Sequence, residues 1–449
     1  MASKRGQDGA QIAVDSHTYA INRIGEISKE LGIDCEYRQL PGYDISQYEK
    51  GQDSHDDDIE KMKEEAKKMS ELGMKAEFKE GFAIRGWDGK VDQRDAVTYA
   101  GQGAFHPTKY ILGVLKWLNQ QPNFQCYTRS RVMSVEEKGL LSKEVKVSTE
   151  SGHTVTCANA VEATCIPLQK LSVVAELEFF RTYCIAIRVP KGTIEDCSLY
   201  DSKDPYHYVR LTACDEKDDY LIIGGGDHKV GQEQEDGRYA ELESWVRDRF
   251  TEAGSVDYKW SGQILEPVDY SAFIGKNQGQ SHIYICTGDF GNGLTHGVIA
   301  GKLIADEITG IENKWSKYYN PKRIPTLSKI PGMIAHDVQI NAQYKRFLQS
   351  DIKDIEDLAP GSGGVLNPTT KTPMAVYKDE DGNVSKFSAL CPHMKGVVCW
   401  NKAEKSWDCP VHGSRFGKDG VGIMGPAFGN LPPADEAAEA LLKQSSAAA

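Results

Sequence analysis

The spacing of apolar and polar positions divides the chain into a long mixed α/β part and a short, strand-rich part towards the C-terminus. Apolar residues that recur at helical spacing predict helices at about 16–31, 56–72, 107–118 and 239–250. Short β-branched and alternating runs predict strands at 131–136, 144–148, 153–157, 160–164, 184–189 and 220–223. Helices and strands mixed in this order predict an α/β (α+β) domain.

The C-terminal part has a different pattern of predicted elements. A predicted helix at 338–348 leads into the turn-rich segment 359–364, and short alternating strands follow at 374–377 and 385–389. This pattern predicts a small all-β sandwich. We therefore divide the chain into an oxidoreductase-like domain at 1–348, the sandwich at 349–434 and a tail at 435–449. The tail is rich in Ala, Glu and Ser and is expected to be disordered.

Composition narrows the function classes. The net charge of −12 and the pI near 5.5 argue against a nucleic-acid partner and against an anionic membrane surface. No apolar run reaches the roughly eighteen residues that would cross a bilayer. The eleven cysteines are scattered without a framework of short spacings, which favours free thiols in a reducing compartment. We expect a cytoplasmic protein.

Two short motifs near the C-terminus carry the clearest chemistry. Cys391 and His393 form a C-x-H pair, and Cys409 and His412 form a C-x-x-H pair after fifteen intervening residues. Each pair offers one thiolate and one imidazole, the mixed ligand set of a Rieske [2Fe–2S] cluster, in which two Cys bind one iron and two His the other. Two Cys and two His also suit a tetrahedral zinc ion, although zinc motifs more often pair like with like.

The residues after the second pair strengthen the cluster interpretation. The run from Cys409 to Phe416 reads Cys-Pro-Val-His-Gly-Ser-Arg-Phe and resembles the second ligand loop of the Rieske family. The resemblance implies that Ser414 donates a hydrogen bond to a cluster sulfur, which would raise the reduction potential. Some high-potential members have Tyr where this chain has Phe416, so a middling or low potential is expected.

A second segment, at 282–306, reads as an apolar strand, a glycine-rich turn and a helix. Three glycines in the turn, Gly288, Gly291 and Gly293, would let the backbone approach a ligand closely. The N–H groups that open the helix would face an anion or an electron-rich ring such as a flavin. A turn that needs glycine only for its geometry is the plainer reading.

Neighbouring segments favour the flavin. Five stretches accompany the turn in a characteristic order, at 102–107, 161–164, 260–263, 266–269 and 272–275. Together they resemble the FAD-dependent amine-oxidising family typified by glycine and D-amino-acid oxidases, in particular the members that end in a Rieske domain. The resemblance implies FAD, a small-molecule substrate such as an amine or amino acid, and a redox partner that the sequence does not identify. The flavin contacts that it implies are Gly288, Gly291, Asn292, Gly293, Leu294 and Thr295, with Val132 as a contact for the adenine.

One feature of that family is missing from this sequence. Its members open with a βαβ unit that carries G-x-G-x-x-G, and no such motif occurs here. Gly224-Gly225-Gly226 lacks the spacing and is interpreted as a bulge or turn. We therefore expect an oxidoreductase domain that is incomplete at its N-terminal side. Two functions stay open: electron transfer between a flavin and the cluster, or a non-catalytic [2Fe–2S] carrier or redox sensor on a flavoprotein scaffold.

Overall fold

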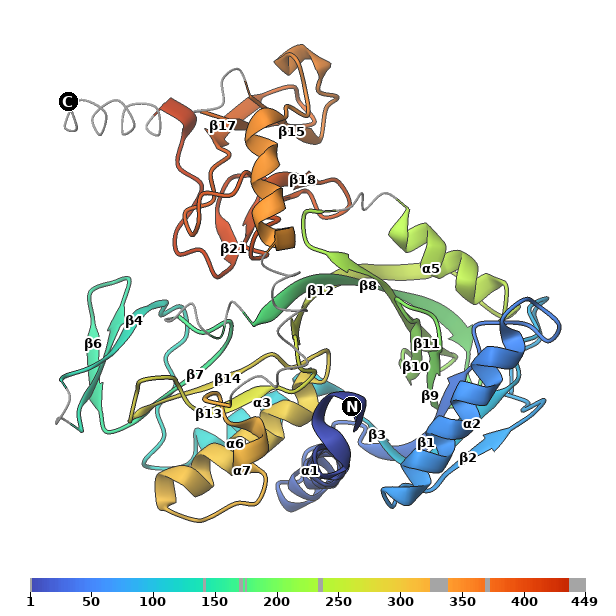
Figure 1. Ribbon diagram of the computed structural model, residues 1–449. Helices are drawn as coiled ribbons and strands as arrows, with labels where there is room; N and C mark the ends of the chain where they lie inside the picture. The colour runs from blue at the N-terminus through green and yellow to red at the C-terminus, as the bar shows by residue number, and fades with distance from the viewer. Residues whose placement is uncertain are drawn as a thin grey trace.

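The computed structural model describes residues 2–139, 143–168, 173, 176–232, 237–323, 338–367 and 372–435. Figure 1 shows a large mixed part formed by the first three quarters of the chain and a smaller β-rich part beside it. The predicted tail falls outside the described residues, apart from its first residue.

An eight-stranded sheet dominates the large part, in the order β12-β8-β11-β10-β9-β1-β3-β2. Neighbouring strands are antiparallel, except that β1 runs parallel to β9. The strands are β1 (Arg38–Ile45), β2 (Ala76–Lys79), β3 (Ala96–Ala104), β8 (Leu177–Pro190), β9 (Ser198–Asp201), β10 (Tyr208–Ala213), β11 (Asp218–Lys229) and β12 (Val256–Pro267). Helices α2 (His55–Glu71) and α5 (Arg238–Arg247) cover its outer face (Figure 1). Alternate residues of the central strands, such as Ile185 and Ile187 on β8, are fully buried beneath α5 with Leu242 and Val246.

The second layer faces the concave side of this sheet (Figure 1). Its three-stranded sheet β13-β14-β7 consists of β13 (Phe273–Lys276), β14 (Ile283–Thr287) and β7 (Ala160–Cys165). A separate antiparallel sheet contains β4 (Val132–Glu137), β5 (Val145–Thr149) and β6 (Thr154–Cys157). The helices of this layer are α1 (Ala2–Glu30), α3 (Pro107–Leu118), α6 (Gly293–Thr309) and α7 (Ser316–Tyr319).

Strand β7 has an open side. It pairs in parallel with β14 on one edge, and no strand among the described residues pairs with its other edge. Parallel strands normally lie in the middle of covered sheets, yet Val161 of β7 is 48% exposed. Nearby in the same layer, α3 is strongly apolar and buries none of its residues, with Ile111 and Leu112 each 59% exposed. Apolar side chains of β7 and α3 are therefore left exposed among the described residues.

The β-rich part contains two small antiparallel sheets around one core. The first is β15 (Ser362–Leu366), β16 (Met374–Lys378) and β17 (Val384–Ser388); the second is β18 (Cys399–Asn401), β19 (Ser406–Asp408), β20 (Arg415–Gly417) and β21 (Gly422–Met424). Short 3-10 helices at η2 (Gln343–Leu348) and η3 (Ile355–Asp357) precede β15. Trp407 and Phe416 are fully buried in the core, together with Cys391 and Cys409. The predicted fold class, an α/β domain followed by a small all-β domain, is confirmed.

The helices predicted from apolar spacing are also present. The helix at 107–118 has the predicted bounds, and α2 and α5 begin and end within three residues of their predicted ends. Helix α1 begins well before the predicted start at 16. The glycine triplet at 224–226 lies in β11, where the pairing with β8 shifts register between Gly225 and His228, so the predicted bulge is confirmed.

Candidate metal centre and flavin-facing loop

The first ligand pair lies in the turn between β17 and β18. Cys391 is 1% exposed, and its N–H donates to the carbonyl of Gly396 at 2.9 Å. Lys395, which adopts a left-handed φ of 59°, donates its N–H back to the Cys391 carbonyl at 2.9 Å. These two bonds close a tight loop that fixes the Cys391 thiol inside the domain and leaves His393 partly exposed.

The second pair lies in the turn between β19 and β20. The N–H of Cys409 donates to the Ser414 carbonyl at 2.8 Å, and the N–H of Gly413 donates to the Cys409 carbonyl at 3.0 Å. The two loops touch at Gly396, where a Cβ atom would lie 2.4 Å from the Val411 side chain and 3.3 Å from the Cys409 Sγ. Glycine is therefore required at 396 to let the loops meet.

The four predicted ligands come together in pairs. The imidazole rings of His393 and His412 have centroids 4.9 Å apart, and the two thiols are neighbours in the buried interior. The neighbouring Cys409 thiol, together with backbone N–H groups of His393 and Met394 and the Ser414 hydroxyl, lowers the pKa of Cys391 to about 7. The same pairing, reinforced by burial, raises the pKa of Cys409. Whichever thiol ionises first therefore suppresses ionisation of the other.

This arrangement fits a [2Fe–2S] cluster. Two thiols side by side and two imidazoles side by side supply one ligand pair for each iron. Backbone N–H groups directed at both sulfurs would stabilise negative charge on a bound cluster. In the described part of the chain, no three His, Cys, Asp or Glu side chains converge as they would around one ion.

Ser414 lies where the family resemblance expects a hydrogen-bond donor to the cluster. It is fully buried, its hydroxyl helps to lower the pKa of Cys391, and it accepts the N–H of Ala427 at 3.0 Å. Donation from this hydroxyl to a cluster sulfur stays a prediction.

The second ligand loop is docked on the end of the eight-stranded sheet. The ring of Phe179 on β8 lies edge-on to His412, with centroids 6.2 Å apart. A Cβ atom at Gly413 would lie 2.8 Å from the Phe179 Cβ, so the loop backbone rests directly on this strand. On β11's side, Gln232 donates to the Pro410 carbonyl at 2.9 Å and the Cys399 thiol donates to the Gly231 carbonyl at 3.0 Å. Cys399, which belongs to neither ligand pair, therefore joins the two parts.

A charged cluster lies beside this contact. Glu404 accepts from Arg181 of β8 at 3.2 Å and from the Tyr239 hydroxyl of α5 at 2.7 Å. Arg415 lies 3.8 Å from the same carboxylate and pairs with Asp408 at 2.9 Å. The side chain of Arg181 is only 4% exposed, and the Glu404 carboxylate offsets the free energy that burying its charge costs.

The predicted glycine-rich turn joins β14 to α6 and faces the concave sheet. Gly288 and Gly291 have left-handed φ values of 70° and 74°. A Cβ at Gly288 would lie 2.7 Å from Pro267, and one at Gly291 would lie 3.9 Å from the Tyr206 hydroxyl. The N–H of Phe290 donates to the Leu265 carbonyl at 3.0 Å, which fastens the turn to β12. Close packing against Pro267 therefore requires glycine at 288, whereas the backbone at 291 is open to the approach of a ligand.

The start of α6 is accessible. Gly291, Asn292, Gly293 and Leu294 are exposed, and the Asn292 side chain makes no capping bond to the helix. The opening N–H groups of a helix carry partial positive charge, which suits the electron-rich edge of a flavin ring. The Thr295 hydroxyl and Nδ1 of His17 on α1 form a hydrogen bond of 2.8 Å. We did not predict this partner. These residues fit the ring end of a flavin.

Two partly buried acids, Asp227 and Glu266, lie on strands β11 and β12 of the large sheet. Asp227 lies in the β11 bulge, and its Oδ1 is buried without a hydrogen-bond partner in the described residues. Burial raises its pKa, and burial together with Glu178 raises the pKa of Glu266 to about 7. Sequence reasoning missed these groups because isolated acids carry no motif.

Val132 does not join this group of residues. It opens β4 and packs, partly buried, against the small cluster of Val135, Val145 and Ile283. Its assignment as an adenine contact stays a prediction.

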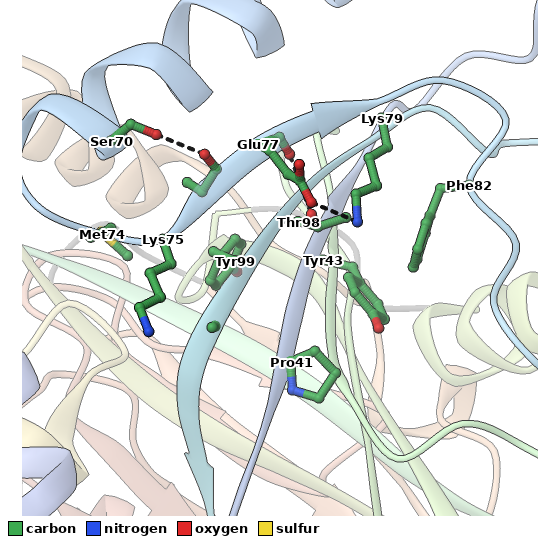
Figure 2. Close-up of a pocket in the computed structure, with 12 residues that line it drawn as sticks. Pro41, Tyr43, Ser70, Met74, Lys75, Glu77, Lys79, Phe82, Thr98 and Tyr99 are labelled. Carbon is green, nitrogen blue, oxygen red and sulfur yellow. Dashed lines mark hydrogen bonds and ion pairs between the residues drawn. The ribbon is translucent and has the colours of Figure 1, made fainter.

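A separate groove lies elsewhere on the large sheet. A cavity of about 490 Å³ opens beside β1, β3 and β2, where Figure 2 shows Tyr43, Phe82, Lys75 and Lys79 around it. Strands β3 and β2 end the sheet at the edge opposite β12 and β8, which hold the ligand loop. The groove is therefore separate from the metal centre.

Comparison with known families agrees with the two parts of the fold. Residues 5–307 match the family described as "FAD dependent oxidoreductase", and residues 351–435 match the "Rieske [2Fe-2S] domain". The first match covers well over half of the chain. The protein belongs to the FAD-dependent oxidoreductase family and carries a C-terminal Rieske domain. These families imply FAD and a [2Fe–2S] cluster as cofactors.

Individual proteins are similar to the whole chain or to one of its two parts. The chain is 24% identical over 434 residues to the "Putative Rieske 2Fe-2S iron-sulfur protein YhfW" of Bacillus subtilis (strain 168), covering 96% of this chain and 81% of the relative. Over 91 residues it is 35% identical to the cytochrome b6-f complex iron–sulfur subunit of Synechococcus elongatus, covering 19% of this chain and 51% of the relative. Glycine oxidase from Geobacillus kaustophilus has a similar fold, with a TM-score of 0.56 and 13% identity, covering 70% of this chain and 82% of that one.

In the part of the chain that the structure describes, none of the helices combines the length and apolar character needed to span a bilayer.

Proposed function

We propose that this protein is an oxidoreductase that transfers electrons between a flavin and its own Rieske cluster. The observation that carries the proposal is the docking of His412, a predicted iron ligand, on Phe179 of the sheet that faces the flavin loop. A bound flavin supplies two-electron chemistry, whereas a [2Fe–2S] cluster carries one electron at a time. A chain that holds both sites together can connect these two modes.

The residues of this chain have separable parts in that function. Cys391, His393, Cys409 and His412 hold the cluster, and the turn at 288–295 holds the ring end of the flavin. Two partly buried carboxyls of the large sheet, Asp227 and Glu266, have raised pKa values, and the value of about 7 for Glu266 lets that group hold or release a proton near neutral pH. We infer a small-molecule amine or amino acid as substrate, because the matched family and the glycine oxidase fold favour that class.

The flavin belongs to the predicted oxidoreductase-like domain at 1–348, and the cluster belongs to the Rieske domain at 349–434. Cytoplasmic location belongs to the same proposal. The redox partner would be a separate small molecule or protein that exchanges single electrons with the cluster.

A second function is favoured by one observation. The unpaired edge of β7 and the exposed apolar residues of α3 leave part of the flavin domain uncovered in the described residues. A protein whose flavin domain is uncovered in this way would act as a [2Fe–2S] carrier or redox sensor on a flavoprotein scaffold.

Cofactor analysis distinguishes the two functions. Iron, acid-labile sulfide, zinc and released flavin are measured per mole of purified protein. Two irons, two sulfides and one FAD support the oxidoreductase. Iron and sulfide without flavin favour the carrier, and zinc alone would overturn both. Cys409→Ser is the control, since it must abolish the iron content if the ligand assignment is right.

A further inference from the structure

The contact between the second ligand loop and the sheet is compact on its apolar side. Phe179 is 6% exposed and belongs to a core cluster that also contains Leu177, Leu265 and Phe273. The small void between this strand and the ligand loop, lined by Phe179, Val411 and Gly413 among others, measures about 10 Å³. A void of that size holds about one water molecule at most. The ring thus shields one side of His412 from solvent.

The same ring connects the two sites through packed atoms. On one side it meets His412, and on the other it shares a core with Leu265. The Leu265 carbonyl in turn accepts the N–H of Phe290, which stands directly before Gly291 in the flavin-facing turn. One continuous path of packing and a single hydrogen bond therefore joins the predicted iron ligand to that turn.

We propose that Phe179 is a positioning residue for His412: it holds the imidazole towards the flavin-facing turn and keeps water from that side of the cluster. This inference rests on the proposed function and names the side chain that would couple the two sites. Phe179 was invisible to sequence reasoning, because 233 residues separate it from His412 and no motif marks it.

The proposal has an electrostatic consequence. In a Rieske cluster the charges of the ferric ions, sulfides and thiolates cancel, so one added electron leaves one net negative charge. Water around His412 would stabilise this reduced form more than the oxidised form. Loss of the ring should therefore raise the midpoint potential of the cluster.

The test compares three variants with the unaltered full-length protein. Phe179→Leu removes the ring, and Phe179→Met removes it while filling more of the space. Phe180→Leu is the matched control, because neighbouring residues of a strand point to opposite faces and Phe180 lies beside Lys229 instead. Midpoint potentials and the spectrum of the reduced cluster are measured by electron paramagnetic resonance, after iron content confirms that the cluster is loaded.

The proposal predicts an upward shift of the potential and a changed spectrum in both Phe179 variants, and neither change in Phe180→Leu. An unshifted potential in Phe179→Met overturns it, even if Phe179→Leu loses its cluster. Equal shifts in all three variants also overturn it. The proposed function fails by a different result, namely unaltered protein that contains no flavin, so the two failures are distinguishable.

Discussion

Replacing Glu404 with alanine should loosen the Rieske domain from the sheet. Its carboxylate accepts from Arg181 and Tyr239 and lies 3.8 Å from Arg415. Both arginines are almost completely buried, with 4% and 5% of their side chains exposed. Arg415 keeps its bond to Asp408 in the variant. Arg181 keeps only its bond to the Ser261 hydroxyl, so its buried charge loses the carboxylate that stabilises it.

The size of the effect follows from these partners. Removing one member of a fully buried ion pair costs about 3–5 kcal/mol. Glu404 is 19% exposed, so water can partly replace it, and we expect a loss of about 2–3 kcal/mol, the range of one hydrogen bond to a charged group. Glu404→Gln should lose less, since it can still accept from Tyr239.

Urea unfolding followed by the visible absorbance of the cluster measures this loss. The matched control is Glu380→Ala, which removes the exposed pair with Lys405, whose side chains are 69% and 49% exposed. Such a surface pair contributes about 0–1 kcal/mol. Equal losses from Glu404→Ala and Glu380→Ala would refute the reasoning that the Glu404 contact is a buried, domain-joining one.

The contacts of Glu404 also make the stability of the protein depend on pH. Burial acts to raise the pKa of Glu404, but hydrogen bonds from Ser261 and Tyr239 and the charges of Arg181 and Arg415 outweigh it, so the net pKa is below 4.5. A lowered carboxyl pKa stabilises the fold at higher pH, and the contribution disappears as the pH falls through the folded-state pKa. The stability difference between the unaltered protein and Glu404→Gln should therefore be constant above about pH 5 and shrink below it.

Three further predictions concern the two sites. Ser414→Ala should lower the midpoint potential of the cluster, since it removes the hydroxyl that we expect to donate to a cluster sulfur; an unchanged potential in a redox titration would contradict this. Gly291→Ala should lower flavin content while Gly310→Ala, at the other end of α6 with a similar φ of 75°, should not; equal losses would mean that backbone strain alone is responsible. Burial lowers the pKa of His17 from 6.5 to about 4, so unfolding measurements should find stability decreasing as the pH falls from 6.5 to 4. That slope should be reduced in His17→Asn, and an equal slope would show that other groups cause it.

Much of the metal centre could be predicted from sequence because its information is local. Each ligand pair lies within one tight turn, so C-x-H and C-x-x-H fix which side chains share a loop. Ser414 follows two residues after His412 and falls on the same turn. The helix at 107–118 was also predictable, because Pro107 at its first turn and the apolar spacing mark its bounds.

Contacts between distant segments could not be predicted in this way. Phe179 and Glu404 each join strands of one part to loops of the other, and their sequence neighbours give no sign of it. The partner of His17 was missed for the same reason, since Thr295 lies 278 positions away. Asp227 became interpretable only when the structure placed it in the bulge of β11 with a buried Oδ1 atom.

The central claim is that flavin and cluster exchange electrons within one chain. The most direct measurement reduces the flavin of the anaerobic, cofactor-loaded protein with a light pulse and follows the cluster signal by electron paramagnetic resonance at several protein concentrations. The account predicts that the reduced-cluster signal appears at a rate independent of protein concentration. A rate that rises in proportion to concentration, or a cluster that stays oxidised while the flavin is reduced, would contradict it.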